Sequence, residues 1–154
     1  MTPPRDLRRL APLLWGLLGL FALRVAGQAL VAAGAAPWLP PMEQWYSGLL
    51  PYPLLVPAQL LILLLYGRVC LDFSRGDGWF VRTRPWFGRG ALVFGWLYLG
   101  AMIVRYPVQM AINPGDRWLG RTLPIVFHWV LAAFVIAFGS FHRRRLRERS
   151  GGAA

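Results

Sequence analysis

The sequence predicts an all-α integral membrane protein, a single transmembrane domain (residues 1–154) in which four helices pack as a bundle. Three observations support this fold class: 56% of the residues are hydrophobic, they gather into four long runs, and arginines lie in blocks between the runs. A bilayer core requires roughly 20 apolar residues in helical form. Four segments have that length, and they cover residues 10–33, 49–71, 91–112 and 123–141.

The distribution of arginine predicts the orientation of these spans. All 17 basic residues are arginines, and most lie in the N-terminal arm, the basic loop 72–90 and the basic tail 142–154. The segments between the other span ends contain only Arg117 and Arg121. Because cytoplasmic segments are enriched in basic residues, we expect a multi-pass protein of the cell (inner) membrane with both termini in the cytoplasm.

A cleavable secretory signal is the alternative interpretation of the first run. The N-terminus is basic, an apolar core follows, and the segment VAAGAAP supplies the small residues of a cleavage site. Arg24 argues against cleavage because it lies between the apolar core and that segment. We therefore expect the first run to remain as a membrane span.

The basic loop 72–90 combines a Gly-Asp-Gly turn at 76–78 with two Trp-Phe pairs, at 79–80 and 86–87. Amphipathic aromatic rings and cations favour the headgroup layer of an anionic leaflet, and the tail 142–154 has the same basic character. Membrane lipids are therefore expected partners of both segments. A docking surface for a cytoplasmic protein is the alternative for the loop.

The first and third spans share a pattern that predicts duplication of a two-helix hairpin. Both copies would enter from the same side, so the two repeats would be parallel and related by an axis along the membrane normal. Arginine and glutamine carry most of this signal because charged residues are rare within membrane spans. At one constant offset, Trp15, Gly19, Arg24 and Gln28 align with Trp96, Gly100, Arg105 and Gln109.

Helical periodicity predicts the inward face of three spans. These faces are Leu17, Phe21, Arg24 and Gln28; Tyr52, Gln59 and Tyr66; and Tyr98, Met102, Arg105 and Gln109. Small residues let membrane helices approach closely. On that basis the predicted packing glycines are Gly16, Gly19, Gly27, Gly95 and Gly100.

Polar residues within the spans are the candidate functional residues. At about 1.5 Å per residue, Arg24 and Arg105 each lie about 21 Å from the cytoplasmic end of their spans, just beyond the midplane. The other polar residues also favour the outer half of the bundle. The candidate ligand-binding residues are therefore Arg24, Gln28, Gln59, Arg105, Gln109 and His128.

An arginine at the centre of a membrane helix raises the free energy of insertion by roughly 2.5–3.5 kcal/mol. Arg24 and Arg105 therefore require partners. Backbone carbonyls, the glutamines, or Glu43 and Asp116 from the outer loops could supply them structurally. Alternatively, an anionic ligand could bridge both guanidinium groups, which match phosphate and carboxylate bidentately. A protein partner that supplies the acid is the third interpretation.

These residues predict a protein that binds or carries an anionic amphiphile, either a lipid phosphate or an organic acid. The first alternative is a non-catalytic accessory or assembly subunit, with a protein partner or a second copy of the chain beside it. The second alternative is a small membrane enzyme or quinone site that uses His128. No catalytic constellation can be named from the sequence, which favours a non-enzymatic role.

Several other function classes lack support in the sequence. No nucleic-acid-binding motif accompanies the net charge of +11, so no nucleic-acid partner is expected. Metal-ligand spacing is absent and no cofactor is expected. His128 and His142 cannot both bind one haem iron within a single chain, because they lie about 21 Å apart along one helix; a bis-histidine haem would need a dimer or another subunit. The single cysteine, Cys70, excludes an internal disulfide.

Overall fold

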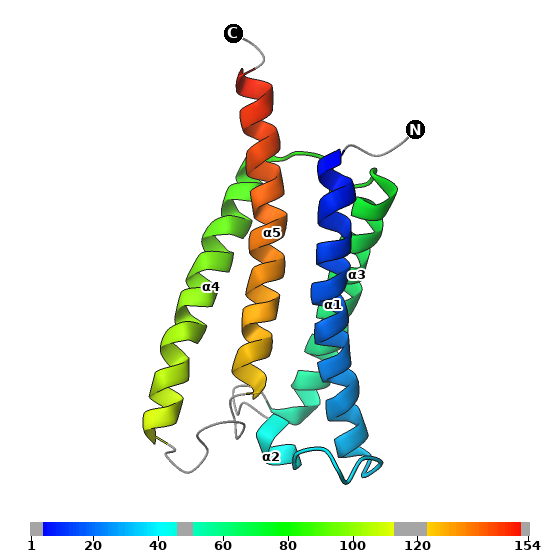
Figure 1. Cartoon of the computed structure of the whole chain (residues 1–154), viewed down its shortest axis with the longest axis vertical. Coiled ribbons are helices and arrows are strands. Elements are labelled where there is room, and N and C mark those ends of the chain that lie inside the picture. Colours follow the sequence, from blue (N-terminus) through cyan, green and yellow to red (C-terminus); the bar gives the residue numbers. More distant parts are fainter. Residues whose placement is uncertain (1–4, 46–50, 113–122, 152–154) are drawn as a thin grey trace.

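The chain forms five helices, described in a computed structural model over residues 5–45, 51–112 and 123–151 (Figure 1). In chain order they are α1 (Arg5–Ala32), α2 (Met42–Trp45), α3 (Tyr52–Arg75), α4 (Pro85–Ile112) and α5 (Leu123–Gly151). All except α2 are long and apolar enough to cross a membrane. The predicted all-helical class and the four apolar spans are thus confirmed, as expected for a multi-pass membrane protein.

All four long helices extend beyond the predicted hydrophobic runs at one of their ends, and α4 and α5 extend furthest. Helix α4 begins at Pro85 rather than at residue 91, because proline is well suited to the first turn, where its missing N–H is not needed. Helix α5 continues to Gly151 rather than ending at residue 141. Its last turns are rich in arginine, which has a high helix propensity, so the helix persists where the apolar run stops.

Helices α1, α3 and α5 pack against one another, and α4 packs on α5. Helix α5 packs against both α4 and α1, and α1 packs in turn against α3. Helix α1 begins and α5 ends at the same end of the bundle, which also holds the loop between α3 and α4 (Figure 1). We call this the basic end, defined by residues 5–10, 68–89 and 141–151, and we call the opposite end the far end.

The apolar core lies towards the basic end. Phe73 of α3 packs edge-on against Phe141 of α5, with ring centroids 4.8 Å apart, and it also contacts Phe138. Nearer the middle, Tyr66 stacks on Phe134 at 3.9 Å. The buried core residues around these rings include Leu7, Ala11, Leu14, Leu18, Val69 and Val81.

The loop between α3 and α4 is anchored to this core through Asp72. Helix α3 is capped by Gly76, which has a positive φ of 75° and donates its N–H to the Asp72 carbonyl. The Asp72 carboxylate is buried, accepts the Phe80 N–H at 3.2 Å and forms an ion pair with Arg68 at 3.2 Å. A buried carboxylate is stable only when paired and hydrogen-bonded, so these contacts hold the loop against the bundle.

Each Trp-Phe pair of the loop divides between the core and the surface. Phe80 and Phe87 pack against the core, whereas Trp79 and Trp86 are exposed. Arg84 lies over the Trp79 ring at 4.2 Å. The pairs therefore serve two roles, because one ring of each anchors the loop and the other faces the surroundings.

Only part of the glycine prediction is correct. A Cβ at Gly27 or Gly95 would meet a packed neighbour within 2.8 Å, so these two glycines do permit close approach. A Cβ at Gly16, Gly19 or Gly100 would meet no atom within 4 Å, so the predicted packing at these three is wrong. The hydropathy of a run does not distinguish a helix face turned towards another helix from one turned outwards. That ambiguity accounts for the error.

Candidate intramembrane polar site

A hydrogen-bonded network connects α1 to α3 in the far half of the bundle. Arg24 donates from Nη1 to Oε1 of Gln28 at 2.7 Å, and Gln59 of α3 donates from Nε2 to the same oxygen at 2.9 Å. All three side chains are buried. The sequence predicted each of these residues as inward-facing, and the structure brings them together.

The backbone of α2 supplies a further partner for Arg24. The Nη2 group of Arg24 donates to the Trp45 carbonyl at 3.0 Å. Trp45 is held in place because its indole N–H donates to the Pro40 carbonyl at 2.9 Å and its ring packs on Gly27. Sequence reasoning missed this partner, because a four-residue helix is too short to show a hydrophobic period.

His128 and Tyr98 form the second part of the site, between α5 and α4. The Tyr98 hydroxyl and Nδ1 of His128 share a hydrogen bond, and the two rings meet edge to face. Helical periodicity predicted Tyr98 on the inward face of its span, but Tyr98 was not among the predicted site residues. Its inward position and its hydroxyl were the available signal. The sequence did not show that His128 on the facing helix is its hydrogen-bond partner.

Arg105 and Gln109 of α4 complete the set of predicted site residues. Arg105 is half-buried on α4 and has an interaction of its own. Gln109, one turn further along α4, is also half-buried, and no described residue forms a hydrogen bond with its side chain.

Gln28 leaves a buried donor without a partner. Its side chain is 2% exposed, and its Nε2 has no hydrogen-bond partner among the described residues. Exchanging the amide oxygen and nitrogen would not satisfy it, because the new NH₂ group would face donors from Arg24 and Gln59. A buried, unpartnered polar atom of this kind calls for a physical explanation.

The described partners of Arg24 are neutral groups. The predicted pairing with a glutamine and a backbone carbonyl is present at Arg24. The other predicted partners, the Glu43 side chain and Asp116, lie outside the described residues. Within the described part of the chain, no group of histidine, cysteine and acidic residues could hold a metal ion.

Comparison of the chain with protein-family models, with curated proteins and with solved structures returns no match. The function proposed below therefore rests on the residues and the geometry of this chain.

Proposed function

We propose that this protein binds or carries an anionic amphiphile, either a lipid phosphate or an organic acid, in the far half of the bundle. The observation that supports this proposal is the buried guanidinium of Arg24, which joins Gln28 and Gln59 in one hydrogen-bonded network between α1 and α3. The contacts described for Arg24 do not neutralise its charge, since both partners are neutral. An anion bound beside Arg24 would neutralise a buried charge that is costly within a membrane.

Arg24 is suited to bind a ligand because its position is already fixed. A guanidinium carries five N–H donors, and the described bonds from Arg24 to Gln28 and Trp45 occupy only two of them. Holding a long side chain in place before binding removes the entropy cost of ordering it. The buried Nε2 of Gln28 offers a further donor, while Gln59 and Gln109 complete the proposed ligand-binding set.

The proposed orientation places the basic end in the cytoplasm and both termini on that side of the cell (inner) membrane. The arginine-rich segments favour this orientation over the inverse one. The ligand site then lies in the outer half of the bilayer, so its amphiphile would come from the outer leaflet or the external side.

Native mass spectrometry of the gently solubilised protein tests the proposal. We expect an acidic adduct on the wild-type protein that is lost in the Arg105→Gln variant. The matched control is Arg82→Gln, which removes the same charge from an exposed position in the loop at the basic end. Because Arg105 also has an interaction of its own, size-exclusion profiles and helical content must first establish that Arg105→Gln is folded.

Two outcomes would contradict the proposal. One is that the wild-type protein has no adduct and is as stable as the Arg105→Gln variant. The other is an adduct that both variants retain. A protein that co-purifies in place of the adduct would instead favour the accessory-subunit alternative.

A further inference from the structure

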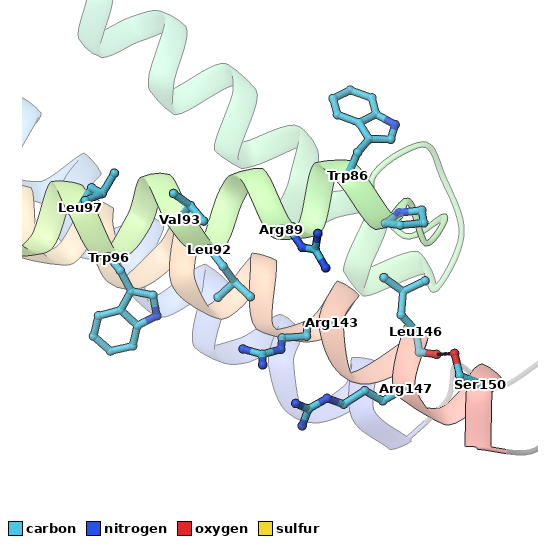
Figure 2. A pocket seen from close by; sticks show the side chains of 11 residues that line it. Trp86, Arg89, Leu92, Val93, Trp96, Leu97, Arg143, Leu146, Arg147 and Ser150 are labelled. Atoms are coloured by element: carbon cyan, nitrogen blue, oxygen red, sulfur yellow. Dashed lines mark hydrogen bonds between the residues drawn. The ribbon is translucent and has the colours of Figure 1, made fainter.

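A groove runs between α4 and α5 at the basic end, remote from the polar site around His128. Its volume is about 1160 Å³, and all of its lining residues belong to these two helices. Figure 2 shows Arg143 and Arg147 extending from α5 on the same side of the helix pair as Trp96, while Arg89 reaches from α4 towards α5. Three guanidinium groups from two helices therefore line one hollow.

The positive charge of this groove is not neutralised within the described residues. Of the tail arginines, Arg145 turns away from the groove, forms an ion pair with Asp6 at 3.1 Å and covers the Phe141 ring. Arg89, Arg143 and Arg147 have no carboxylate partner in the described part of the chain. The groove should therefore attract an anion.

The lining changes from charged to apolar along α4. Arg89 lies on the charged side, and Leu92 and Trp96 continue the wall further into the bundle. From Arg89 to Trp96 the helix rises by about 10 Å, at about 1.5 Å per residue. Both helices are apolar enough to lie within a membrane over this stretch. A ligand that fits this lining has an anionic head and an apolar body.

We propose that the groove between α4 and α5 is a binding site for an anionic phospholipid, whose phosphate is held by Arg89, Arg143 and Arg147. Its acyl chains lie along Leu92 and Trp96. Arginine forks bind phosphate bidentately, and an amphipathic tryptophan favours the boundary between headgroups and acyl chains. This site does not depend on the proposed function, because it shares no residue with the site around His128.

Lipid titration monitored by native mass spectrometry tests the inference. The full chain is delipidated and titrated with dioleoyl phosphatidylglycerol or with dioleoyl phosphatidylcholine. The test variant is the double substitution Arg143→Gln, Arg147→Gln. Its matched control is Arg144→Gln, Arg149→Gln, which removes the same charge from two exposed arginines of α5 that do not line the groove. Size-exclusion profiles and helical content establish that each variant is folded.

The expected result is one tightly bound phosphatidylglycerol on the wild type and on the control. Its affinity should fall by about tenfold or more in the test variant, because two charge-assisted contacts to the phosphate are lost. Phosphatidylcholine should bind more weakly than phosphatidylglycerol to the wild type. The single variant Arg89→Gln removes the guanidinium group that α4 contributes to the groove, and it should weaken binding of the same lipid.

Three results would overturn the inference. Equal losses in the two double variants would show attraction by net charge rather than a built site. Equal binding of the two lipids would show that the anionic head is not recognised. Inorganic phosphate that binds with the same dependence on Arg143 and Arg147, and that displaces the lipid, would show a site for free phosphate. An Arg105→Gln variant that retains the lipid separates this groove from the site around His128.

Discussion

Gln28 links two helices through one amide oxygen, because that oxygen accepts hydrogen bonds from Arg24 of α1 and Gln59 of α3. In a membrane interior each lost hydrogen bond has no water to replace it. The importance of a buried polar residue therefore depends on how many donors rely on it. Gln28 and Gln109 are aligned in the sequence, but only Gln28 accepts hydrogen bonds from described residues.

Replacement of Gln28 by leucine should destabilise the protein. The Gln28→Leu variant keeps an apolar side chain of similar size but leaves donors of Arg24 and Gln59 without their acceptor. We expect a loss of about 1–2 kcal/mol in the free energy of unfolding. Reversible unfolding in mixed detergent micelles measures it. Gln109→Leu is the matched control and should change the free energy little, and equal losses in both would refute the role assigned to Gln28.

Asp72 should contribute more to stability than its neighbour in the loop, Asp77. The Asp72→Asn change retains the shape of the side chain but removes the charge that faces Arg68 and weakens the acceptor for the Phe80 N–H. Because Arg68 is more than half exposed, its ion pair adds little, and we expect a loss of about 1 kcal/mol, mainly from the buried carboxylate.

Thermal unfolding in detergent measures the effect of Asp72→Asn. Asp77→Asn is the control, because Asp77 is exposed and, among the described residues, accepts only the adjacent Gly78 N–H. An equal decrease in both variants would mean that the carboxylate of Asp72 does not hold the loop against the core.

At the residue scale, the sequence predicted which polar side chains lie inside but not what they contact. Arg24, Gln28 and Gln59 stood out because polar groups are rare in membrane spans. The Trp45 carbonyl could not be predicted, since a backbone acceptor leaves no signature in the sequence. The pairing of Tyr98 with His128 depends on how α4 and α5 are aligned, which neither helix specifies alone.

Helices α4 and α5 approach each other closely where glycines remove side chains from the interface. A Cβ at Gly88 would lie 2.5 Å from the Cβ of His142, and one at Gly139 would lie 2.9 Å from the Leu92 backbone nitrogen. Neither glycine was among those predicted to pack. Glycine content shows that close approach can occur, whereas the positions that use it follow from the facing helix.

The Gly139→Ala substitution should force α4 and α5 apart. The added methyl group would meet backbone atoms of Leu92 and Gly88, which cannot rotate away as a flexible side chain can. We expect a destabilisation of about 1–3 kcal/mol, measured as reduced resistance to unfolding in detergent.

Gly100→Ala is the matched control for this interface. Its added methyl group meets open space, and alanine is the better helix former, so stability should be unchanged or slightly higher. Equal stability of Gly139→Ala and Gly100→Ala would contradict the close packing of α4 on α5.

For the molecule as a whole, hydropathy predicted the four long helices, because a bilayer demands long apolar runs. The order of packing could not be predicted in this way. Helix α1 contacts α5, but the corresponding contact under the predicted duplication, between α4 and α3, is absent from the described residues. The duplication stays a prediction, based on the alignment of the spans that contain Arg24 and Arg105.

The proposed orientation predicts which ends of the molecule a membrane-impermeant maleimide can reach. Cys70 is fully buried, so the unsubstituted protein should remain unlabelled and is the background control. The Arg149→Cys variant places a thiol on the exposed end of α5, and Trp38→Cys places one at a position 78% exposed between α1 and α2.

In intact cells the Trp38→Cys variant should be labelled and Arg149→Cys should not, whereas inside-out vesicles should reverse the two results. This outcome follows from placing the arginine-rich basic end in the cytoplasm. Labelling of Arg149→Cys in intact cells, with protection of Trp38→Cys, would invert the orientation and move the site around His128 to the cytoplasmic half of the bilayer. Labelling of one variant from both sides would indicate two orientations, which so strong an arginine asymmetry should prevent.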